Sequence, residues 1–371
     1  MNARRILAMI LLVTSACESS PSPSDAGDGG AGPRADAGPI EPPACEGVVR
    51  EPPAPACAPL ATDYAPGRDD AWPACISDDG EYHRIRPDIS TVARVRAYEE
   101  LEALLFDPTR DPSADDFLAG RLLYQEPEGL DSRLVRRYDP HFEVPEGTDC
   151  TIDGAPEAYP DYCVGPAVLS PLVLGAFQAG IEGSAEAPRV HAARIQAALL
   201  WFLAVSTYKE SLTCTRVAQD CDSSYAYYTG GEEARGGIGL AEEVRAVDPL
   251  AHDRAWDGLL AVRCWRDLDP AEVATDLARR DLAREQYDRA VTDGLAAILR
   301  DRLLRLCDTA GAELAYHFAF VQVLGRALDR EARERDAAQA AALREELARE
   351  RPAEVDVARA VAAIDALFDC P

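Results

Sequence analysis

The sequence predicts an all-α fold, either one large helical bundle or two fused bundles, stabilised by disulfides. Beyond Asp88, apolar residues recur every three or four positions, the spacing of one helix face, and no segment shows a comparable strand pattern. Residues 197–205 and 315–321 are apolar almost without interruption, so each predicts a helix buried on all sides. The eleven cysteines comprise Cys17 and an even number of others, which in an exported chain favours a disulfide framework.

Residues 1–16 have the pattern of a lipoprotein signal peptide. Arg4 and Arg5 precede a short apolar stretch, and small residues then lead directly to Cys17. This ending resembles the lipobox of bacterial lipoproteins, in which the cysteine is lipidated and becomes the mature N-terminus. We therefore expect attachment to a membrane through lipid on Cys17, with an ordinary signal peptide as the alternative. Because Glu18 follows rather than Asp, we expect the outer membrane more than the inner, with the protein facing the periplasm or the cell surface.

Residues 17–66 predict a disordered tether between this anchor and a helical domain at 67–371. The tether is rich in Ser, Pro, Ala, Gly and Asp and has almost no large apolar residues, so it cannot bury enough surface to offset chain entropy. Cys45, Cys57 and Cys75 lie in or just after it. They indicate that its distal part is joined to the domain by disulfides.

The first part of the domain predicts short helices followed by a loop. Apolar periodicity predicts a helix that ends near Pro108, with Asp88 as its N-cap. Two more short helices are expected at 113–124 and 129–138. The segment 139–165 is rich in Pro, Gly and Asp and is expected to be a loop.

The middle of the domain is organised around one long helix. Residues 166–181 are expected to be helical, with a restart at Ser170, and the central helix then covers 185–210. Its nine successive apolar residues are too few to span a bilayer, so we expect the core helix of a soluble domain. A cysteine-bracketed loop, 214–221, leads from it into the acidic and aromatic segment 222–231.

The last third predicts longer helices. The Asp-Pro pairs at 248–249 and 269–270 are helix-start signatures, and the second of these helices is expected to run to about Leu306. Residues 310–351 predict a second core helix that continues into a solvated stretch rich in Ala, Glu and Arg. A last helix is expected at 353–368.

Two disulfides are expected to be local. They join Cys150 to Cys163 and Cys214 to Cys221, whose short separations favour pairing. No cysteines have the CxxC spacing of a thiolate metal site, so metal binding by cysteine is not expected. The connectivity of the other cysteines cannot be read from their spacing.

Charge and motifs exclude several classes of function. The chain has 38 basic and 65 acidic residues and a formal net charge of −27, so a basic patch for nucleic acid or anionic lipid is not expected. The acidic surface mainly confers solubility. HExxH, GxSxG and phosphate-binding glycine motifs are absent from the sequence, so catalysis is not expected.

Glu313 and His317 are the first candidate metal ligands. Their four-residue spacing places both side chains on one face of the second core helix, where a carboxylate and an imidazole can share a metal. Helical bundles build metal sites from facing helices, so Glu210 or His191 of the central helix is expected to complete the site. The alternative is a hydrogen-bonded Glu–His pair without a metal.

The segment 222–231 supplies the second set of candidate ligands. It combines Asp222 with three tyrosines, of which Tyr225 and Tyr228 are the candidates. Phenol and carboxylate oxygens are hard donors that suit ferric iron. The alternative is a capped helix whose tyrosines pack on the core.

The order of these features resembles a known family. The chain is similar to the algal low-iron-inducible periplasmic iron-assimilation proteins, and more loosely to imelysin-like periplasmic proteins, over about residues 166–351. The segments that carry the likeness are Tyr208-Lys209-Glu210, Asp222-Ser-Ser-Tyr225-Ala-Tyr-Tyr228-Thr-Gly230 and Tyr316-His317-Phe318. The GxHxxE signature of imelysin-like proteins is absent. The resemblance implies extracytoplasmic iron binding or delivery without catalysis.

Two functions follow as expectations. The first is a non-catalytic lipoprotein that binds a metal, iron above all, for uptake or delivery. Its ligands would come from Glu210, Asp222, Tyr225, Tyr228, Glu313 and His317. The second is a structural or protein-interaction lipoprotein without a small ligand, in which the same residues satisfy one another inside the bundle. The sequence does not specify a protein partner.

Overall fold

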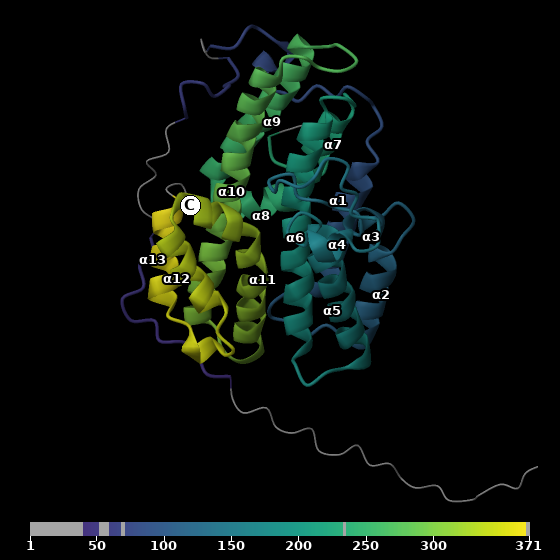
Figure 1. The fold of residues 1–371 in the computed structure, drawn as a ribbon. Helices are drawn as coiled ribbons and strands as arrows, with labels where there is room; N and C mark the ends of the chain where they lie inside the picture. The colour runs from purple at the N-terminus through teal and green to yellow at the C-terminus, as the bar shows by residue number, and fades with distance from the viewer. Residues whose placement is uncertain (1–39, 52–58, 68–70, 233–234, 369–371) are drawn as a thin grey trace, which may run out of the picture. The chain divides into compact units, whose positions relative to one another are not determined.

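Every regular element in the described part of the chain is helical, as the sequence predicts. The computed structural model describes residues 40–51, 59–67, 71–232 and 235–368, so the signal peptide and Cys17 lie outside it. The α-helices (Figure 1) are α1 (Thr91–Leu105), α2 (Ala114–Tyr124), α3 (Leu130–Leu134), α4 (Ala155–Ala158), α5 (Ser170–Glu182), α6 (Pro188–Thr213), α7 (Asp220–Thr229), α8 (Leu240–Val247), α9 (Pro249–Leu268), α10 (Leu277–Asp308), α11 (Gly311–Arg335), α12 (Ala337–Leu347) and α13 (Val357–Leu367). Shorter turns are the 3-10 helices η1 (Ile76–Asp79) and η3 (Pro352–Glu354) and the π-helix η2 (Gly165–Leu169).

Two helix starts agree with the sequence prediction because a side chain caps each one. The Ser113 hydroxyl accepts a hydrogen bond from the Asp116 amide, and the Asp116 carboxylate accepts one from the Ser113 amide, so α2 begins with a capping box. Asp248 likewise accepts hydrogen bonds from the Leu250 and Ala251 amides at the start of α9.

The helix expected to start at Asp269 begins later, so that prediction is wrong. The Asp269 carboxylate accepts hydrogen bonds from the amides of Thr275 and Asp276, which lie too far along the chain for a helix cap and instead close a loop. Helix α10 begins at Leu277. Asp276 is its N-cap and accepts a hydrogen bond from the Arg279 amide.

Three other boundaries also differ from the prediction. Helix α1 begins after Ser90 rather than at Asp88. The helix expected at 129–138 is only the short α3. The stretch 310–351 is not continuous, because Asp336 adopts an extended backbone, ends α11 and caps α12 through its carboxylate.

The acidic and aromatic segment is a helix rather than an open loop. Helix α7 ends at Gly230, which adopts the left-handed conformation with φ of 69° that glycine tolerates best. A disulfide between Cys214 and Cys221 joins the end of α6 to the first turn of α7. All three tyrosines of α7 are buried, which agrees with the alternative of a capped helix packed on the core.

Helix α6 is the central helix of the bundle. It packs against α5, α7 and α11, and α11 in turn packs against α10 and α12 (Figure 1). By length and composition α6 could cross a membrane, but 94% of its apolar window is buried inside the protein, as in a core helix. One continuous hydrophobic core extends from α1 to α13, so a single large bundle describes the domain.

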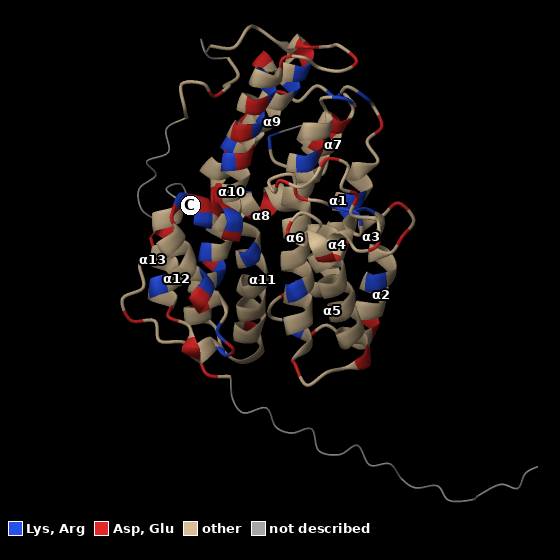
Figure 2. Cartoon of the chain, viewed as in Figure 1, with Lys and Arg blue, Asp and Glu red and all other residues tan. Residues whose placement is uncertain are grey.

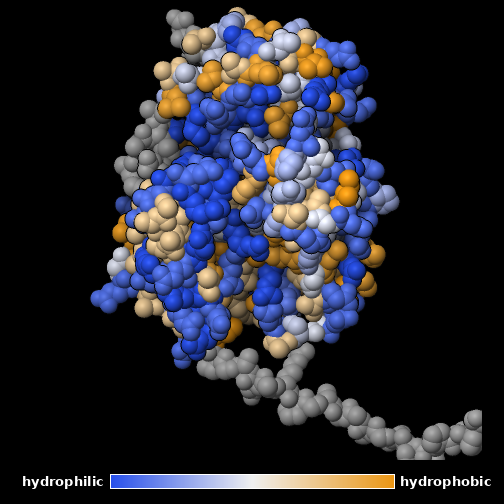
Figure 3. All heavy atoms as spheres, in the orientation of Figure 1, coloured by the Kyte–Doolittle hydropathy of each residue, from blue (hydrophilic) through white to orange (hydrophobic). Residues whose placement is uncertain are grey.

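The face seen in Figure 2 separates charged helices from apolar ones. Acidic and basic side chains are dense on α9, α10 and α12, whereas α5 and α6 are mostly uncharged. Figure 3 shows a hollow on this face between the α11–α12 side and the α5–α6 side, with apolar residues visible inside it. On this face, apolar and charged side chains therefore lie close together where the α5–α6 side meets the α11–α12 side.

Helices α9 and α10 approach each other closely at a glycine. A Cβ atom built on Gly258 of α9 would lie 2.6 Å from the Tyr287 Cα atom and 2.9 Å from its backbone nitrogen. Such distances are far below van der Waals contact, so only glycine fits at this crossing.

Four disulfides are present among the described residues, and both expected local pairs are confirmed. Cys150 bonds Cys163 within the loop after α3, and Cys214 bonds Cys221. The other two bonds are Cys45–Cys307 and Cys75–Cys264. Cys57 and Cys370 lie outside the described residues.

The segment before α1 belongs to the folded domain from well before residue 67. Cys45 is bonded to the end of α10, and the sequence separation of this pair is 262 residues. Tyr64 is 1% exposed, and its amide and carbonyl both bond the Gln286 side chain of α10. The described residues of the segment assigned to the tether, 40–51 and 59–66, are therefore part of the domain's surface rather than a free linker.

Candidate functional site

Glu210 lies near the end of α6 in a buried ion pair. Its carboxylate bonds Arg137 Nη1 at 3.0 Å and Lys209 Nζ at 3.1 Å, and it accepts a hydrogen bond from the Thr213 hydroxyl at 3.3 Å. Burial alone would raise the pKa of Glu210, but Arg137 and Lys209 lower it below its usual value. The carboxylate is thus ionised and already neutralised by protein groups.

Asp222 and Tyr225 of α7 bond the segment that precedes α1. The Asp222 carboxylate accepts hydrogen bonds from the amides of Ile85 and Arg86 and from the Tyr82 hydroxyl, at 2.8 to 3.2 Å. The Tyr225 ring stacks on Tyr82 with 3.8 Å between ring centroids, and its hydroxyl donates to the carbonyl of residue 232. Both side chains hold this segment against the bundle.

Tyr228 faces a different neighbour. Its hydroxyl lies 3.2 Å from Nδ1 of His252 on α9, and its ring meets that of Tyr287 edge to face. Burial, with a contribution from Arg245, lowers the pKa of His252 to about 4, so the imidazole is neutral and can accept the tyrosine proton in a hydrogen bond. This contact lies in the core.

Glu313 and His317 lie on one face of α11, as their spacing predicts. His317 Nε2 is 3.9 Å from the Glu313 carboxylate, and His317 is 2% exposed. Burial, with the charges of Arg302 and Arg305, lowers the pKa of His317 to about 3. Nδ1 of this neutral imidazole has no hydrogen-bond partner in the described structure, yet two nearby guanidinium groups oppose the approach of a metal cation.

The structure does not bring the six predicted ligands to one place. Gln196 of α6 bonds the hydroxyl of Tyr316, which is the residue beside His317. Glu210 lies about four turns further along α6, which is roughly 20 Å at the helical rise. Asp222 bonds the segment before α1, whereas Tyr228 contacts His252 of α9. Iron binding by this set stays a prediction, and the geometry offers no shared coordination site for it.

His191, expected to complete that site as an alternative to Glu210, is likewise engaged. Its Nε2 lies 2.7 Å from the Ser184 hydroxyl near the start of α6. Burial lowers the pKa of His191, so the ring is neutral in this contact. It fixes the turn between α5 and α6.

Another metal-ligand group was missed by the sequence interpretation. Asp79 ends η1 and Glu81 and His83 follow it, and the ligand atoms of the three residues lie within 4.8 Å of one another. His83 Nε2 bonds Asp79 at 2.7 Å, while both carboxylates are exposed. Their alternate spacing was a weak signal because an extended segment places such side chains on one side. Exposed acidic groups commonly gather without an ion, so we assign no metal to this cluster.

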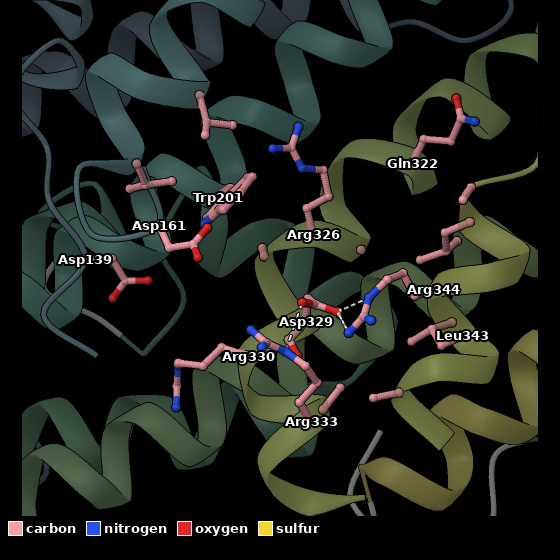
Figure 4. A pocket seen from close by; sticks show the side chains of 18 of the residues that line it. Asp139, Asp161, Trp201, Gln322, Arg326, Asp329, Arg330, Arg333, Leu343 and Arg344 are labelled. Atoms are coloured by element: carbon pink, nitrogen blue, oxygen red, sulfur yellow. Dashed lines mark hydrogen bonds and ion pairs between the residues drawn. The ribbon is translucent and has the colours of Figure 1, made fainter. Parts of the chain in front are cut away.

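A cleft between α6 on one side and α11 and α12 on the other is a second feature that the sequence did not predict. We call it the α6–α11 cleft, and its volume is about 350 Å³. One wall is formed by Trp201 of α6 and the segment before α5, and the other by α11 and α12 (Figure 4). Its lining residues are Asp139, Phe142, Asp161, Val164, Val168, Trp201, Gln322, Gly325, Arg326, Ala327, Asp329, Arg330, Ala332, Arg333, Ala340, Leu343, Arg344, Leu347 and Ala348.

The α11–α12 wall of the cleft is rich in arginine. Asp329 bonds both Arg333, at 3.1 Å, and Arg344, at 2.6 Å, so one negative charge serves two positive ones (Figure 4). The guanidinium of Arg326 instead lies 5.8 Å from the centre of the Trp201 ring on the facing wall. Arg326 is exposed and forms no ion pair with any residue that the structure describes.

The opposite wall is held in place by a charged histidine. His141 Nδ1 lies 2.6 Å from the Asp139 carboxylate, its Nε2 lies 3.0 Å from Asp288 of α10, and its ring stacks on Tyr208. Burial alone lowers the pKa of His141, but hydrogen bonds and charges of the two aspartates raise it to about 9. The imidazolium thus clamps the cleft's loop to α10.

This clamp predicts a pH-dependent stability. The pKa of His141 is about 9 in the folded protein and 6.5 in the unfolded chain. The stabilisation is therefore complete below pH 6.5 and is lost as the pH rises through 9. We expect His141→Gln to lower the free energy of unfolding by roughly 1–3 kcal/mol at pH 6 and by much less near pH 10. Urea unfolding of both proteins at the two pH values measures the difference, and an equal loss at both would contradict the clamp.

A second cavity, of about 570 Å³, lies beside Glu313 and His317, but its cations are already engaged. Arg300 bonds Asp365 at 2.7 Å and three backbone carbonyls of residues 49–51. The other arginines that line it, Arg50, Arg302 and Arg305, pair with Asp308, Glu243 and Asp301. The arginines that line this cavity therefore already have carboxylate partners.

Comparisons with known proteins add no further constraint on the site. No model of a protein family matches the chain, and no curated protein or solved structure matches it. The resemblance to iron-assimilation proteins consequently stays a prediction from short segments. A function is therefore argued from the contacts of the predicted ligands and from the α6–α11 cleft.

Proposed function

We propose that the protein is an exported, lipid-anchored, non-catalytic binding protein that takes a small organic ligand in the α6–α11 cleft. The observation that carries this proposal is the cleft itself. Its volume of about 350 Å³ falls within the usual range of ligand pockets, and it lies between two groups of helices, where such pockets commonly form. Its lining combines an apolar surface with a few charged groups, the usual composition of a ligand site.

The predicted iron ligands give less support to metal binding. Glu210 is neutralised by Arg137 and Lys209, and Asp222 is saturated by two amides and a hydroxyl. These partners would have to be displaced for either carboxylate to coordinate a metal, at the cost of leaving buried polar groups unpaired. The alternative in which these residues satisfy one another accounts for their contacts.

A thermal-shift screen tests cleft binding against metal binding. The mature chain is screened with neutral, anionic and cationic organic compounds and with ferrous and ferric iron. We expect at least one organic compound to raise the melting temperature, because a ligand at a hundred times its Kd stabilises the fold by about 2.7 kcal/mol. We do not expect stoichiometric iron binding of the kind that Glu313→Ala and His317→Ala would abolish.

Matched variants locate the binding. Ala327→Phe places a ring in the cleft at a half-buried position, whereas Ala341→Phe adds the same ring at an exposed position of α12 that does not line it. The organic compounds should lose their effect in the first variant and keep it in the second. If the compounds stabilise Ala327→Phe and Ala341→Phe equally, cleft binding is refuted. If the protein binds stoichiometric iron and loses it in Glu313→Ala and His317→Ala, the iron hypothesis is favoured. No response to any compound would favour the interaction lipoprotein with an unidentified protein partner.

The lipid anchor is a separate part of the proposal. We expect Cys17→Ala to release the protein from the membrane fraction or to block its maturation, since the lipid would be attached to the Cys17 thiol. Metabolic labelling with a fatty acid should mark the parent chain only. An unchanged fractionation without label would indicate an ordinary secreted protein, and fractionation of inner from outer membrane tests the expected outer-membrane location.

A further inference from the structure

We infer, building on the proposed function, that the α6–α11 cleft binds an organic anion, with its charged group at Arg326 and an apolar body against Trp201. Four arginines and three aspartates line the cleft, whereas the whole chain has a net charge of −27. Three of these arginines have carboxylate partners, because Arg333 and Arg344 share Asp329 and Arg330 pairs with Glu331 and Glu334. Arg326 has none among the residues that the structure describes, so it is the lining cation that is left for an anion.

No aspartate of the lining forms an ion pair with Arg326 in the described structure. Asp329 is shared between Arg333 and Arg344, so that cluster keeps one net positive charge. Asp139 bonds His141, whose imidazolium also bonds Asp288. Figure 4 shows the Asp329 cluster and Arg326 on the same wall, with the Arg326 side chain extended away from Asp329.

Arg326 has the features of a receptor for a carboxylate or similar group. Its guanidinium is held over the Trp201 ring at 5.8 Å, which limits its motion without occupying its N–H donors. No carboxylate of the described structure pairs with it. A planar guanidinium with unused donors binds a carboxylate through two parallel hydrogen bonds.

The rest of the lining suits an apolar body. Trp201 is 8% exposed at the wall, and Val164 and Val168 lie on the same side. Leu343 and Leu347 of α12 form the facing side. Transfer of an alkyl chain from water to such a surface contributes about 0.8 kcal/mol per buried methylene group, so the body supplies affinity and Arg326 selects the charge.

Three ligands of equal chain length test the charge selection. Octanoate, 1-octanol and octylammonium are titrated into the mature chain with Cys17→Ala, so that neither lipid nor detergent competes. Binding is measured by calorimetry and by tryptophan fluorescence. We expect octanoate to bind at least about tenfold more tightly than octylammonium, since a charge-assisted hydrogen bond contributes about 1.5–3 kcal/mol.

Two variants of equal charge change isolate Arg326. Arg326→Gln should weaken octanoate binding at least about tenfold and leave octanol binding within about twofold. Arg96→Gln removes another exposed arginine, on α1, for which the described structure has no ion pair, and should leave octanoate binding within about twofold. Trp201→Phe should abolish the fluorescence response while calorimetric binding persists.

The outcomes separate this inference from the proposed function. If octanol or octylammonium binds as tightly as octanoate, or if Arg326→Gln changes nothing, the anion preference is overturned while a ligand cleft stands. If none of the three binds, the anion inference is overturned. The proposed function is then tested by the thermal-shift screen, with Ala327→Phe as the variant that fills the cleft. An equal loss in Arg96→Gln and Arg326→Gln would show a general charge effect and would also overturn it.

Discussion

Gly258→Ala is expected to lower the free energy of unfolding by about 3 kcal/mol or more, which is among the largest effects of any single methyl group in this protein. The added Cβ would lie 2.6 Å from the Cα atom of Tyr287, so a backbone atom rather than a flexible side chain must move. Because α9 and α10 form one of the most extensive helix pairs, their separation would disturb the packing of both. Urea unfolding followed by circular dichroism measures the change.

A second glycine provides the control. Gly175 of α5 is exposed, and a Cβ built on it meets nothing within 4 Å. Gly175→Ala should therefore stabilise the protein by about 0.5–1 kcal/mol, because alanine loses less conformational entropy than glycine in a helix. A Gly258→Ala protein as stable as the wild type would mean that the two helices do not approach as closely as described.

Glu210→Ala is expected to destabilise the protein by about 3–5 kcal/mol, because it leaves the buried Arg137 without its carboxylate. Arg137 is 5% exposed, and its other contacts are the Tyr227 hydroxyl at 3.2 Å and the rings of Phe202 and Tyr227. None of these neutralises a positive charge. Glu210 is also one of the predicted metal ligands, so the effect of this variant on stability must be measured before any binding result is interpreted.

Glu345→Ala is the matched control for this prediction. Glu345 also pairs with two arginines, Arg349 and Arg359, but its side chain is 52% exposed, so the expected loss is much smaller than that of Glu210→Ala. Replacing Arg137 and Glu210 together by leucine should recover much of the loss, since no buried charge then lacks a partner. If Glu210→Ala is as stable as the double variant Arg137→Leu/Glu210→Leu, the ion-pair explanation is contradicted.

The sequence predicts the helical content and the local disulfides because both depend on nearby residues. The capping of α9 by Asp248 was predictable since the N-cap, the proline and the amides lie within four positions. Asp269 has the same Asp-Pro signature, yet its carboxylate bonds amides six and seven positions later. Which amides a carboxylate reaches depends on the loop that follows, and periodicity contains no information about that loop.

The candidate site was less predictable because donor types do not reveal their partners. Glu210 and Asp222 have the chemistry of metal ligands, but Arg137 and the amides of Ile85 and Arg86 reach them from segments that are distant in sequence. The cleft likewise arises where residues 139–168 approach α11 and α12. No local pattern places Trp201 beside Arg326, so this contact was found only in the structure.

The long disulfides also determine what a proteolytic cut can achieve. Every peptide bond between Cys75 and Cys264 is bridged by two covalent links, Cys45–Cys307 and Cys75–Cys264. One cut anywhere in that interval leaves both fragments joined, so the C-terminal helices stay covalently linked to the N-terminal part of the described chain. Release of the domain by a protease would then require reduction as well, or a cut on the N-terminal side of Cys45. In an oxidising compartment, the covalent connection between the two ends of the domain is thus protected independently of its folding stability.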